Sequence, residues 1–311
     1  MATDAHVLAQ AGLRREKTAR ERYLSPITNF VRTKPLGTFG AVIVIVLILA
    51  AAFPGVFSFG TSPDAQVLSD RLQGPSSAHW FGTDQLGRDL YTRIVYGART
   101  SITIGFGVVF VSSVIATVLG VMSGYYGGWF DTVTQRLVDI GIALPGLIFI
   151  ILFVTSIKEV PFTHTPISVI LAIIISVGLL IAVGSSRVIR GAAIGAKQNQ
   201  YVEAARVLGA SDTRIIFRHV LPNVFAVILV GASIQIGGAI LIESSLAFLG
   251  YGVQPPTASW GRSITEAQVY LVNYPHLAIF PGLAIFFTVY SFNMLGDALR
   301  DVLDPRLRGS R

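Results

Sequence analysis

Six long stretches of this 311-residue chain contain no Asp, Glu, Lys or Arg, and this pattern restricts the fold more than any other feature. The uncharged stretches are residues 35–63, 100–130, 140–157, 160–186, 219–242 and 267–296. A helix needs roughly 20 apolar residues to cross a hydrocarbon layer about 30 Å thick. Only 13% of the residues are charged, whereas soluble domains have about a quarter. We therefore expect an all-α membrane protein with six transmembrane helices, near 36–57, 101–123, 138–157, 167–187, 220–243 and 276–297.

The basic residues fall mostly on one side of the expected membrane. With six spans, the alternating polar segments carry 18 and 6 Lys and Arg residues respectively. Because basic residues of short loops stay in the cytoplasm, both termini are expected there, with 58–98, 158–166 and 244–275 outside. The basic run from Arg14 to Arg22 is interpreted as a topology determinant that also attracts anionic lipid, and no nucleic-acid partner is expected.

Several kinds of chemistry are excluded by residues that the chain lacks. It has no cysteine, which excludes disulfides, Cys-ligated zinc, iron–sulfur clusters and thiol catalysis. A P-loop needs a lysine directly after a glycine, and none of Lys17, Lys34, Lys158 and Lys197 follows one. We expect no bound cofactor or metal and no catalytic residue, so ATP and Mg²⁺ would be bound by partner chains.

Ionisable residues are absent from the middle of the six spans, with Asp139 and Glu243 at span ends. This absence counts against an ion-coupled transporter, which usually carries charges near the midplane. Small and weakly polar residues occur instead, namely Gly105, Gly107, Ser112, Ser113 and Gly120 in the second span and Ser233, Gln235, Gly237 and Gly238 in the fifth. Two roles are possible for these residues, either close packing between helices or lining of a solute path.

A short helix is predicted in the polar segment after the fourth span. Tyr201, Ala205 and Leu208 recur at helical spacing and form one apolar face. Gly209 is expected to end this helix, because glycine adopts a left-handed conformation at no steric cost. Ser211 is predicted to cap a second helical turn, and Pro222 marks the return to the bilayer.

Local features outside this segment have mainly structural interpretations. Asp84, Arg88 and Asp89, with His79 nearby, are expected to form an ion-paired surface turn rather than a metal or acid–base cluster. Pro255-Pro256 breaks any helix and Trp260 suits a membrane interface, so residues 246–265 are expected to be an external loop or a re-entrant segment. Pro145 and Pro281 are expected to bend the third and sixth spans.

The segment after the fourth span is similar to the EAA loop of ATP-binding-cassette (ABC) importer permeases. The matching residues are Glu203, Ala204, Ala205, Gly209, Leu221 and Pro222. One position departs, since His219 stands where the family pattern often has Ile; peptide-permease branches commonly carry Arg-His there. In that family the loop forms a coupling helix that sits in a groove of the nucleotide-binding subunit. The resemblance therefore implies contacts with that subunit for Tyr201, Glu203, Ala204, Ala205, Arg206, Leu208 and Gly209.

Further motifs resemble the C-type permeases of dipeptide, oligopeptide and nickel importers. They are Trp80 to Asp89, Tyr96 to Ser101, Gly124 to Asp131, Phe248 to Gly261 and Asn293 to Asp301, followed by Asp304-Pro305-Arg306. The resemblance implies the type I ABC importer permease (MetI-like) fold. It divides the chain into a cytoplasmic tail (1–35), a first span with an external segment (36–98), a permease domain (99–298) with the EAA loop at 199–222, and a second cytoplasmic tail (299–311).

The implied function is that of a permease subunit in the cytoplasmic (inner) membrane of a prokaryote, taking up di- or oligopeptides. Nickel chelates, glutathione or other small solutes are the alternatives within the same architecture. The resemblance implies a homologous second permease, two nucleotide-binding ATPase subunits and an extracytoplasmic solute-binding protein as partners. A membrane enzyme would need catalytic groups gathered at one bilayer face, and only the region from Asp84 to Asp89 is a candidate.

Overall fold

The computed structural model describes residues 30–158 and 166–303 of the chain. The basic run before residue 30, most of the predicted loop at 158–166 and the basic end after residue 303 therefore lie outside the described residues. Within them the regular structure is helical and contains no named strand. The long helices are α3 (Pro35–Ala52), α5 (Leu90–Tyr126), α6 (Gly128–Ala143), α7 (Gly146–Lys158), α8 (Pro166–Lys197), α11 (Leu221–Phe248) and α13 (His276–Leu303). Short helices are α4 (Pro54–Phe57), α9 (Gln200–Val207), α10 (Asp212–Ile215) and α12 (Trp260–Ala267).

Five of the helical segments in the described part are long and apolar enough to span a membrane, and a bent pair supplies a sixth. The predicted span over 138–157 falls on α6 and α7, two helices that together form a bent pair with an angle of 88° between them. Pro145 lies at this break, and Leu144 before it has extended backbone (φ −70°, ψ 132°). A proline disfavours helical backbone at the preceding residue, so the bend predicted at Pro145 is confirmed. Pro281 lies inside α13 without ending it.

Several helices extend well beyond the predicted apolar segments. Helix α5 has 37 residues, which corresponds to a length of about 55 Å, and α8 has 32. Asp139 and Glu243 consequently lie within helices rather than at their ends. Asp139 pairs with Arg187 across α6 and α8, and the buried Glu243 accepts a hydrogen bond from Ser101 Oγ at 3.4 Å.

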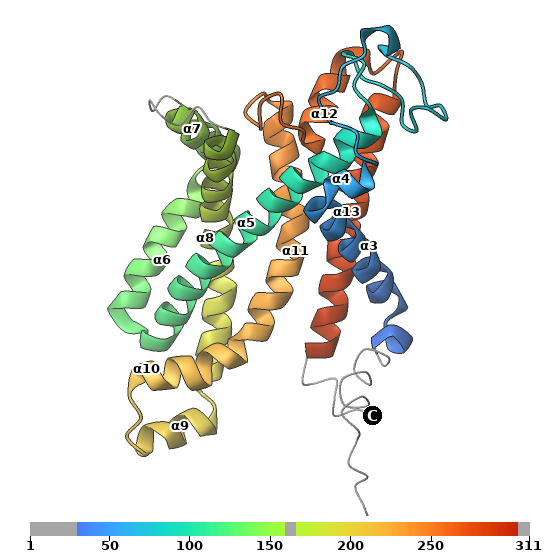
Figure 1. The fold of residues 1–311 in the computed structure, drawn as a ribbon. Helices are drawn as coiled ribbons and strands as arrows, with labels where there is room; N and C mark the ends of the chain where they lie inside the picture. The colour runs from blue at the N-terminus through green and yellow to red at the C-terminus, as the bar shows by residue number, and fades with distance from the viewer. Residues whose placement is uncertain (1–29, 159–165, 304–311) are drawn as a thin grey trace, which may run out of the picture.

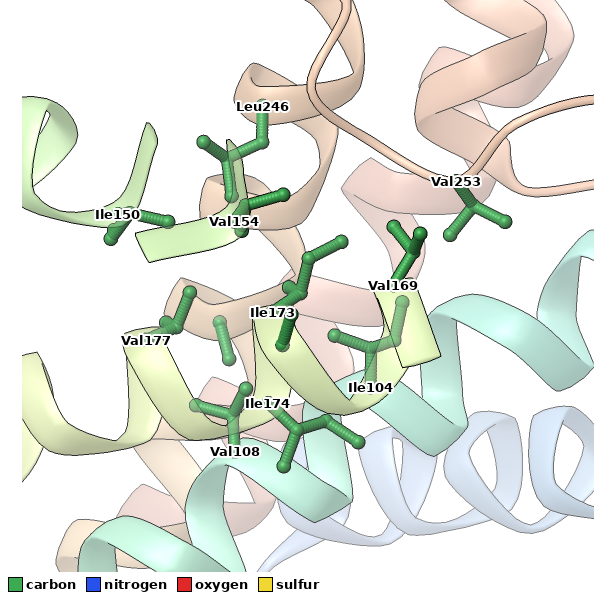
Figure 2. Close-up of a cluster of buried hydrophobic side chains, with 12 residues drawn as sticks. Ile104, Val108, Ile150, Val154, Val169, Ile173, Ile174, Val177, Leu246 and Val253 are labelled. Atoms are coloured by element: carbon green, nitrogen blue, oxygen red, sulfur yellow. The ribbon is translucent and has the colours of Figure 1, made fainter. Parts of the chain in front are cut away.

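The polar segments gather at the two ends of the helical bundle. The α9–α10 loop, the turn between α5 and α6 and the end of α13 lie at one end, and α12 and the segment 58–89 lie at the other (Figure 1). This arrangement groups together the segments that charge counting places on the same side of the membrane. The apolar core between α5, α7 and α8 includes Ile104, Val108, Val154, Ile173 and Val177 (Figure 2).

The region 246–265 contains the end of one helix, a loop and the start of a short helix. Helix α11 continues to Phe248, and after a loop the chain forms α12, which packs against α5, α11 and α13. Trp260 is not at an interface: only 1% of it is exposed, and its indole nitrogen donates to the Ile94 carbonyl oxygen at 2.9 Å. Its ring occupies a cluster shared by α3, α5, α11 and α13. A buried tryptophan usually pairs its N–H with a hydrogen-bond acceptor. Here the acceptor belongs to α5, which is far from Trp260 in the sequence.

Helices α5 and α8 pack closely along a row of glycines on α5. A β-carbon added at Gly120 would lie 2.6 Å from the Ser186 carbonyl oxygen, and one at Gly124 would lie 2.8 Å from the Arg190 carbonyl oxygen. Small residues allow such backbone approach, which drives helix association in lipid. The packing interpretation of Gly120 is therefore confirmed.

We expect Gly120→Ala to destabilise the protein, because the added methyl group meets backbone atoms of α8 that cannot rotate away. Overpacking of this kind costs about 1–3 kcal/mol. Gly191→Ala on α8 is the matched control, since a β-carbon there meets no atom within 4 Å. Thermal unfolding of the purified protein in detergent should show a lower midpoint for Gly120→Ala alone. Equal midpoints for the two variants would contradict the close contact.

Candidate functional site

The loop between α8 and α11 forms a compact helical hairpin at the end of the bundle (Figure 1). Helix α9 spans Gln200–Val207 and α10 spans Asp212–Ile215, and the second runs through a π-helical turn, Ile216–Val220, into α11. The Ser211 side chain accepts a hydrogen bond from the Arg214 backbone N–H, as predicted for a cap. The π-helical turn has no counterpart in the sequence prediction.

Gly209 ends α9 in the predicted left-handed conformation, with φ +80°. The Gly209 N–H donates to the Arg206 carbonyl oxygen, and the Ala210 N–H donates to the Ala205 carbonyl oxygen, each at 3.0 Å. These two bonds satisfy carbonyl groups that would otherwise lack partners at a helix end. No other part of the described chain lies within 4 Å of a β-carbon built at Gly209, so backbone conformation alone restricts this position.

The apolar face predicted for α9 is only partly correct. Val202, which was not assigned to it, is fully buried against Ile215 and Val220. Ala205 packs beside this cluster, but Tyr201 is 40% exposed and Leu208 is 87% exposed. The reason is tertiary: α10 and the π-helical turn approach α9 from the side of Val202. Apolar side chains are consequently left exposed on the outer side of the hairpin.

Helix α5 holds the hairpin through Tyr125. Its phenolic O–H donates to Asp212 Oδ1 at 2.6 Å, which joins the end of α5 to the start of α10. The Lys197 ammonium donates to the Tyr125 carbonyl oxygen and lies 5.4 Å from the centre of its ring. Tyr125 lies in the motif from Gly124 to Asp131, but sequence analysis did not pair it with Asp212, because 87 residues separate the two and neither belongs to the EAA pattern.

A cavity of about 390 Å³ lies beside α9. It is lined by Gly124, Ile194, Lys197, Gln198, Glu203 and Arg206. Glu203 and Ala204 are exposed in α9, as are Arg206 and Gly209. His219, at the position that departs from the family pattern, places its ring 6.0 Å from that of Tyr201. The predicted set of residues is thus gathered on one small surface that offers charged groups, a cavity and exposed apolar side chains.

At the opposite end of the bundle, Asp84 and Arg88 form an ion pair of 2.6 Å. The ion-paired interpretation is confirmed, but the surface location is wrong, since Asp84 is 5% exposed and Arg88 is 3% exposed. Arg88 also pairs with Glu266 of α12 at 2.8 Å, and Arg93 lies 3.7 Å from both carboxylates. Sequence analysis missed Glu266. The residue could have been found from Arg262 four residues earlier, because this spacing favours an ion pair on a helix, and the two side chains do pair at 2.9 Å.

Asp89 and His79 have a separate role. Asp89 accepts a hydrogen bond from the Thr92 N–H at 2.8 Å and so caps α5, and it contacts His79 Nδ1 at 3.0 Å. A side-chain acceptor at this position satisfies one of the free N–H groups of a helix start. Within the part of the chain that the structure describes, no three His, Cys, Asp or Glu side chains converge as metal ligands would.

Comparisons with known proteins place these features in a family context. Residues 116–309 match the family described as "Binding-protein-dependent transport system inner membrane component". The glutathione transport system permease protein GsiD of Pectobacterium atrosepticum is 39% identical over 303 residues, covering 97% of each chain. The protein of the same name from Escherichia coli O1:K1 is 39% identical over 278 residues, covering 89% of each chain.

A solved structure shares the fold. A chain from the crystal structure of an amino acid ABC transporter with histidines superimposes with a TM-score of 0.52 at 14% identity. The match covers 68% of this chain and 94% of that chain. The type I ABC importer permease fold expected from the sequence is therefore confirmed.

We expect Glu266→Ala to destabilise the protein by about 3–5 kcal/mol, because it leaves Asp84 as the one buried carboxylate beside the buried guanidinium groups of Arg88 and Arg93. Asp64→Ala is the matched control, since Asp64 is a 47%-exposed partner of Arg93 at 3.6 Å. An exposed pair contributes only about 0–1 kcal/mol. Urea unfolding of the two purified variants measures how much free energy of unfolding each has lost. Equal losses would contradict the buried network.

The same carboxylate predicts a pH dependence. Burial opposes ionisation of Glu266, but Arg93, Arg262 and Arg88 outweigh it and hold its pKa below the ordinary value. The stabilisation is therefore complete above the unfolded-state pKa of about 4.3 and is lost as the pH falls through the lower folded-state pKa. Glu266→Gln should flatten this part of the stability curve, whereas an unchanged slope would show that other carboxylates cause it.

Proposed function

This chain belongs to the binding-protein-dependent transport system inner membrane component family, and on that premise we propose that it is the permease subunit of an ATP-driven importer for glutathione or similar short peptides. The observation that carries the proposal is the 39% identity over 97% of the chain to a glutathione transport system permease protein. Glutathione is a tripeptide, so this solute also falls within the peptide class suggested by the sequence motifs. The chain is a multi-pass membrane protein of the ABC permease type and makes no covalent bond itself.

The proposed assembly contains this chain, a homologous second permease, two ATPase subunits and an extracytoplasmic solute-binding protein. The absence of any Gly-Lys pair supports a separate source of ATP hydrolysis, since no P-loop can form here. The asymmetry of basic residues supports cytoplasmic termini. In that orientation the hairpin of α9 and α10 faces the cytoplasm, where ATPase subunits would bind.

We assign the contact with the ATPase to the exposed side of α9. Val207 and Leu208 are 83% and 87% exposed, which is unusual for large aliphatic side chains unless a partner covers them. Glu203 and Arg206 stand beside them at the cavity rim and would select the partner by charge. Tyr201, Ala204, Ala205 and Gly209 complete the proposed surface by setting the shape and the end of the helix.

The hydrogen bond between Tyr125 and Asp212 supports a mechanical route from this surface into the membrane. A displacement of α9 and α10 by the ATPase would pull on the end of α5, which runs unbroken to the opposite end of the bundle. Because α5 packs tightly on α8, the two helices would move together. Rigid-body movement of this kind is a standard route to alternating access.

The function is tested by reconstituting the chain with its partner permease, ATPase subunits and binding protein in liposomes. We expect glutathione uptake that requires ATP and every one of these components. Uptake that persists without ATP, or ATP hydrolysis by this chain purified free of any ATPase, would contradict the proposal.

Gly209→Val is expected to abolish coupled transport while leaving membrane abundance near normal. A β-branched residue resists φ +80°, at a cost of about 1–2 kcal/mol, so α9 would end differently and its outer side would be misplaced. Gly209→Asn is the matched control, because asparagine tolerates the left-handed conformation. Uptake and ATPase stimulation are measured in the assembled complex, and normal values for both variants would exclude α9 as the contact.

Tyr125→Phe removes the hydrogen bond to Asp212 but retains the aromatic ring beneath Lys197. The loss of a bond to a partly exposed carboxylate costs about 1–2 kcal/mol, too little to prevent folding. We expect the complex to assemble and hydrolyse ATP with reduced uptake per ATP. Tyr126→Phe is the control, since the neighbouring ring is 49% exposed. An unchanged ratio of uptake to hydrolysis in Tyr125→Phe would show that this bond does not transmit movement.

A further inference from the structure

A cavity of about 100 Å³ lies between α5, α8 and α11, and its lining extends on α8 from Ser185 to Ile189. Its polar lining consists of Ser113 from α5, Ser185 from α8 and Gln235 from α11, with Gly231 one turn before Gln235. The rest of the wall is formed by valine and isoleucine side chains of α8 and α11. Three helices thus each direct one neutral polar side chain toward the same space.

The hydrogen-bonding capacity of these side chains is not used up within the protein. A glutamine side chain can accept two hydrogen bonds and donate two. Gln235 accepts one from Ser112 Oγ at 3.3 Å, and its amide nitrogen has no partner among the described residues. Ser185 donates back to the Ile181 carbonyl oxygen at 2.9 Å, which leaves its oxygen able to accept. The cavity therefore offers both donors and acceptors to whatever fills it.

The position of Ser113 on α5 makes this capacity significant. Ser113 lies about 20 Å along α5 from Arg99, the nearest charged residue before it on that helix. At such depth a polar side chain usually faces the bundle interior or a water-filled space, because hydrocarbon leaves it unpaired. A volume of about 100 Å³ exceeds the share of one water molecule, about 30 Å³. The site is thus polar enough and large enough to be hydrated.

We propose that this cavity is a hydrated part of the solute path and binds the uncharged amide portion of the transported peptide. The proposal rests on the proposed function and adds a location and a chemical class to it. A peptide group both donates and accepts, as the hydroxyls and the carboxamide require. No ionisable side chain lines the cavity, so an ammonium or carboxylate group would lose hydration there without a counter-charge. Arg187 is close in sequence but pairs with Asp139.

The absence of cysteine makes a direct test possible, because each introduced thiol is the sole one in this chain. Ser113→Cys and Ser185→Cys place a thiol in the cavity with little change of shape. Ser176→Cys is the matched control, since Ser176 lies on the same helix as Ser185, is fully buried and does not line the cavity. The probe is a charged methanethiosulfonate, which reacts with the thiolate and so requires water at the site. Labelling is measured on the assembled complex in liposomes.

We expect both cavity thiols to react at least about tenfold faster than Ser176→Cys, and S-methylglutathione, whose blocked sulfur cannot consume the probe, to slow their reaction. Labelling as slow as that of Ser176→Cys would show a space closed by packing or filled by lipid and would overturn the proposal. Rapid labelling that S-methylglutathione does not slow would show water without solute contact and would also overturn it.

Gln235→Leu supplies an independent measurement. The substitution keeps the approximate volume but removes the amide, and we expect uptake to fall by about three- to tenfold, the effect of one hydrogen bond. Gln235→Asn, which keeps the amide, should retain more uptake. Unchanged uptake in Gln235→Leu would overturn the proposed amide contact. Failure of the complex that contains the unsubstituted chain to take up glutathione would instead refute the proposed function, so the two failures are distinguishable.

Discussion

The close approach of α5 and α8 is the contact on which the rest of the structure depends. Inside hydrocarbon the backbone must satisfy its own hydrogen bonds, which restricts this chain to helices. Between helices in lipid there is little hydrophobic driving force, so association relies on close van der Waals contact. Gly120 and Gly124 permit that contact by leaving room for backbone atoms of α8. The pair then serves as a frame against which α6, α7 and α11 pack.

The two ends of α5 connect this frame to polar structures of different kinds. At one end Arg93 joins the buried cluster of Asp84, Arg88 and Glu266, which attaches α12 and the preceding segment to the helix. Such a cluster is costly to desolvate, and removing one member is destabilising because the others stay buried without compensation. At the other end the Tyr125 hydroxyl donates a hydrogen bond to Asp212 of an exposed helical hairpin. The first arrangement resists deformation, whereas the second is the connection through which we propose that movement reaches the bundle.

Much of the fold and part of the candidate site could be predicted from sequence because they depend on local preferences. Uncharged stretches of about 20 residues identify spans whatever their neighbours are, and Pro145 bends the chain because its ring acts on the residue before it. The left-handed conformation of Gly209 was also predictable, because it depends on the glycine itself, which adopts that conformation at no steric cost. The hydrogen bond between Tyr125 of α5 and Asp212 of the hairpin was not predictable, because it depends on where α5 ends relative to α10.

The sequence by itself determined that this chain is helical, crosses a membrane several times and belongs with ABC permeases, because hydropathy, charge and short motifs act over a few residues. Tertiary structure alone decided which side chains are covered. The packing buries Trp260, which was expected at a membrane interface, and Arg88, which was expected in a surface turn. It leaves Leu208 exposed, although the helical spacing of Leu208 predicted a packed face. Burial depends on neighbours distant in the chain, and helical periodicity says which residues share a face but not what lies against it.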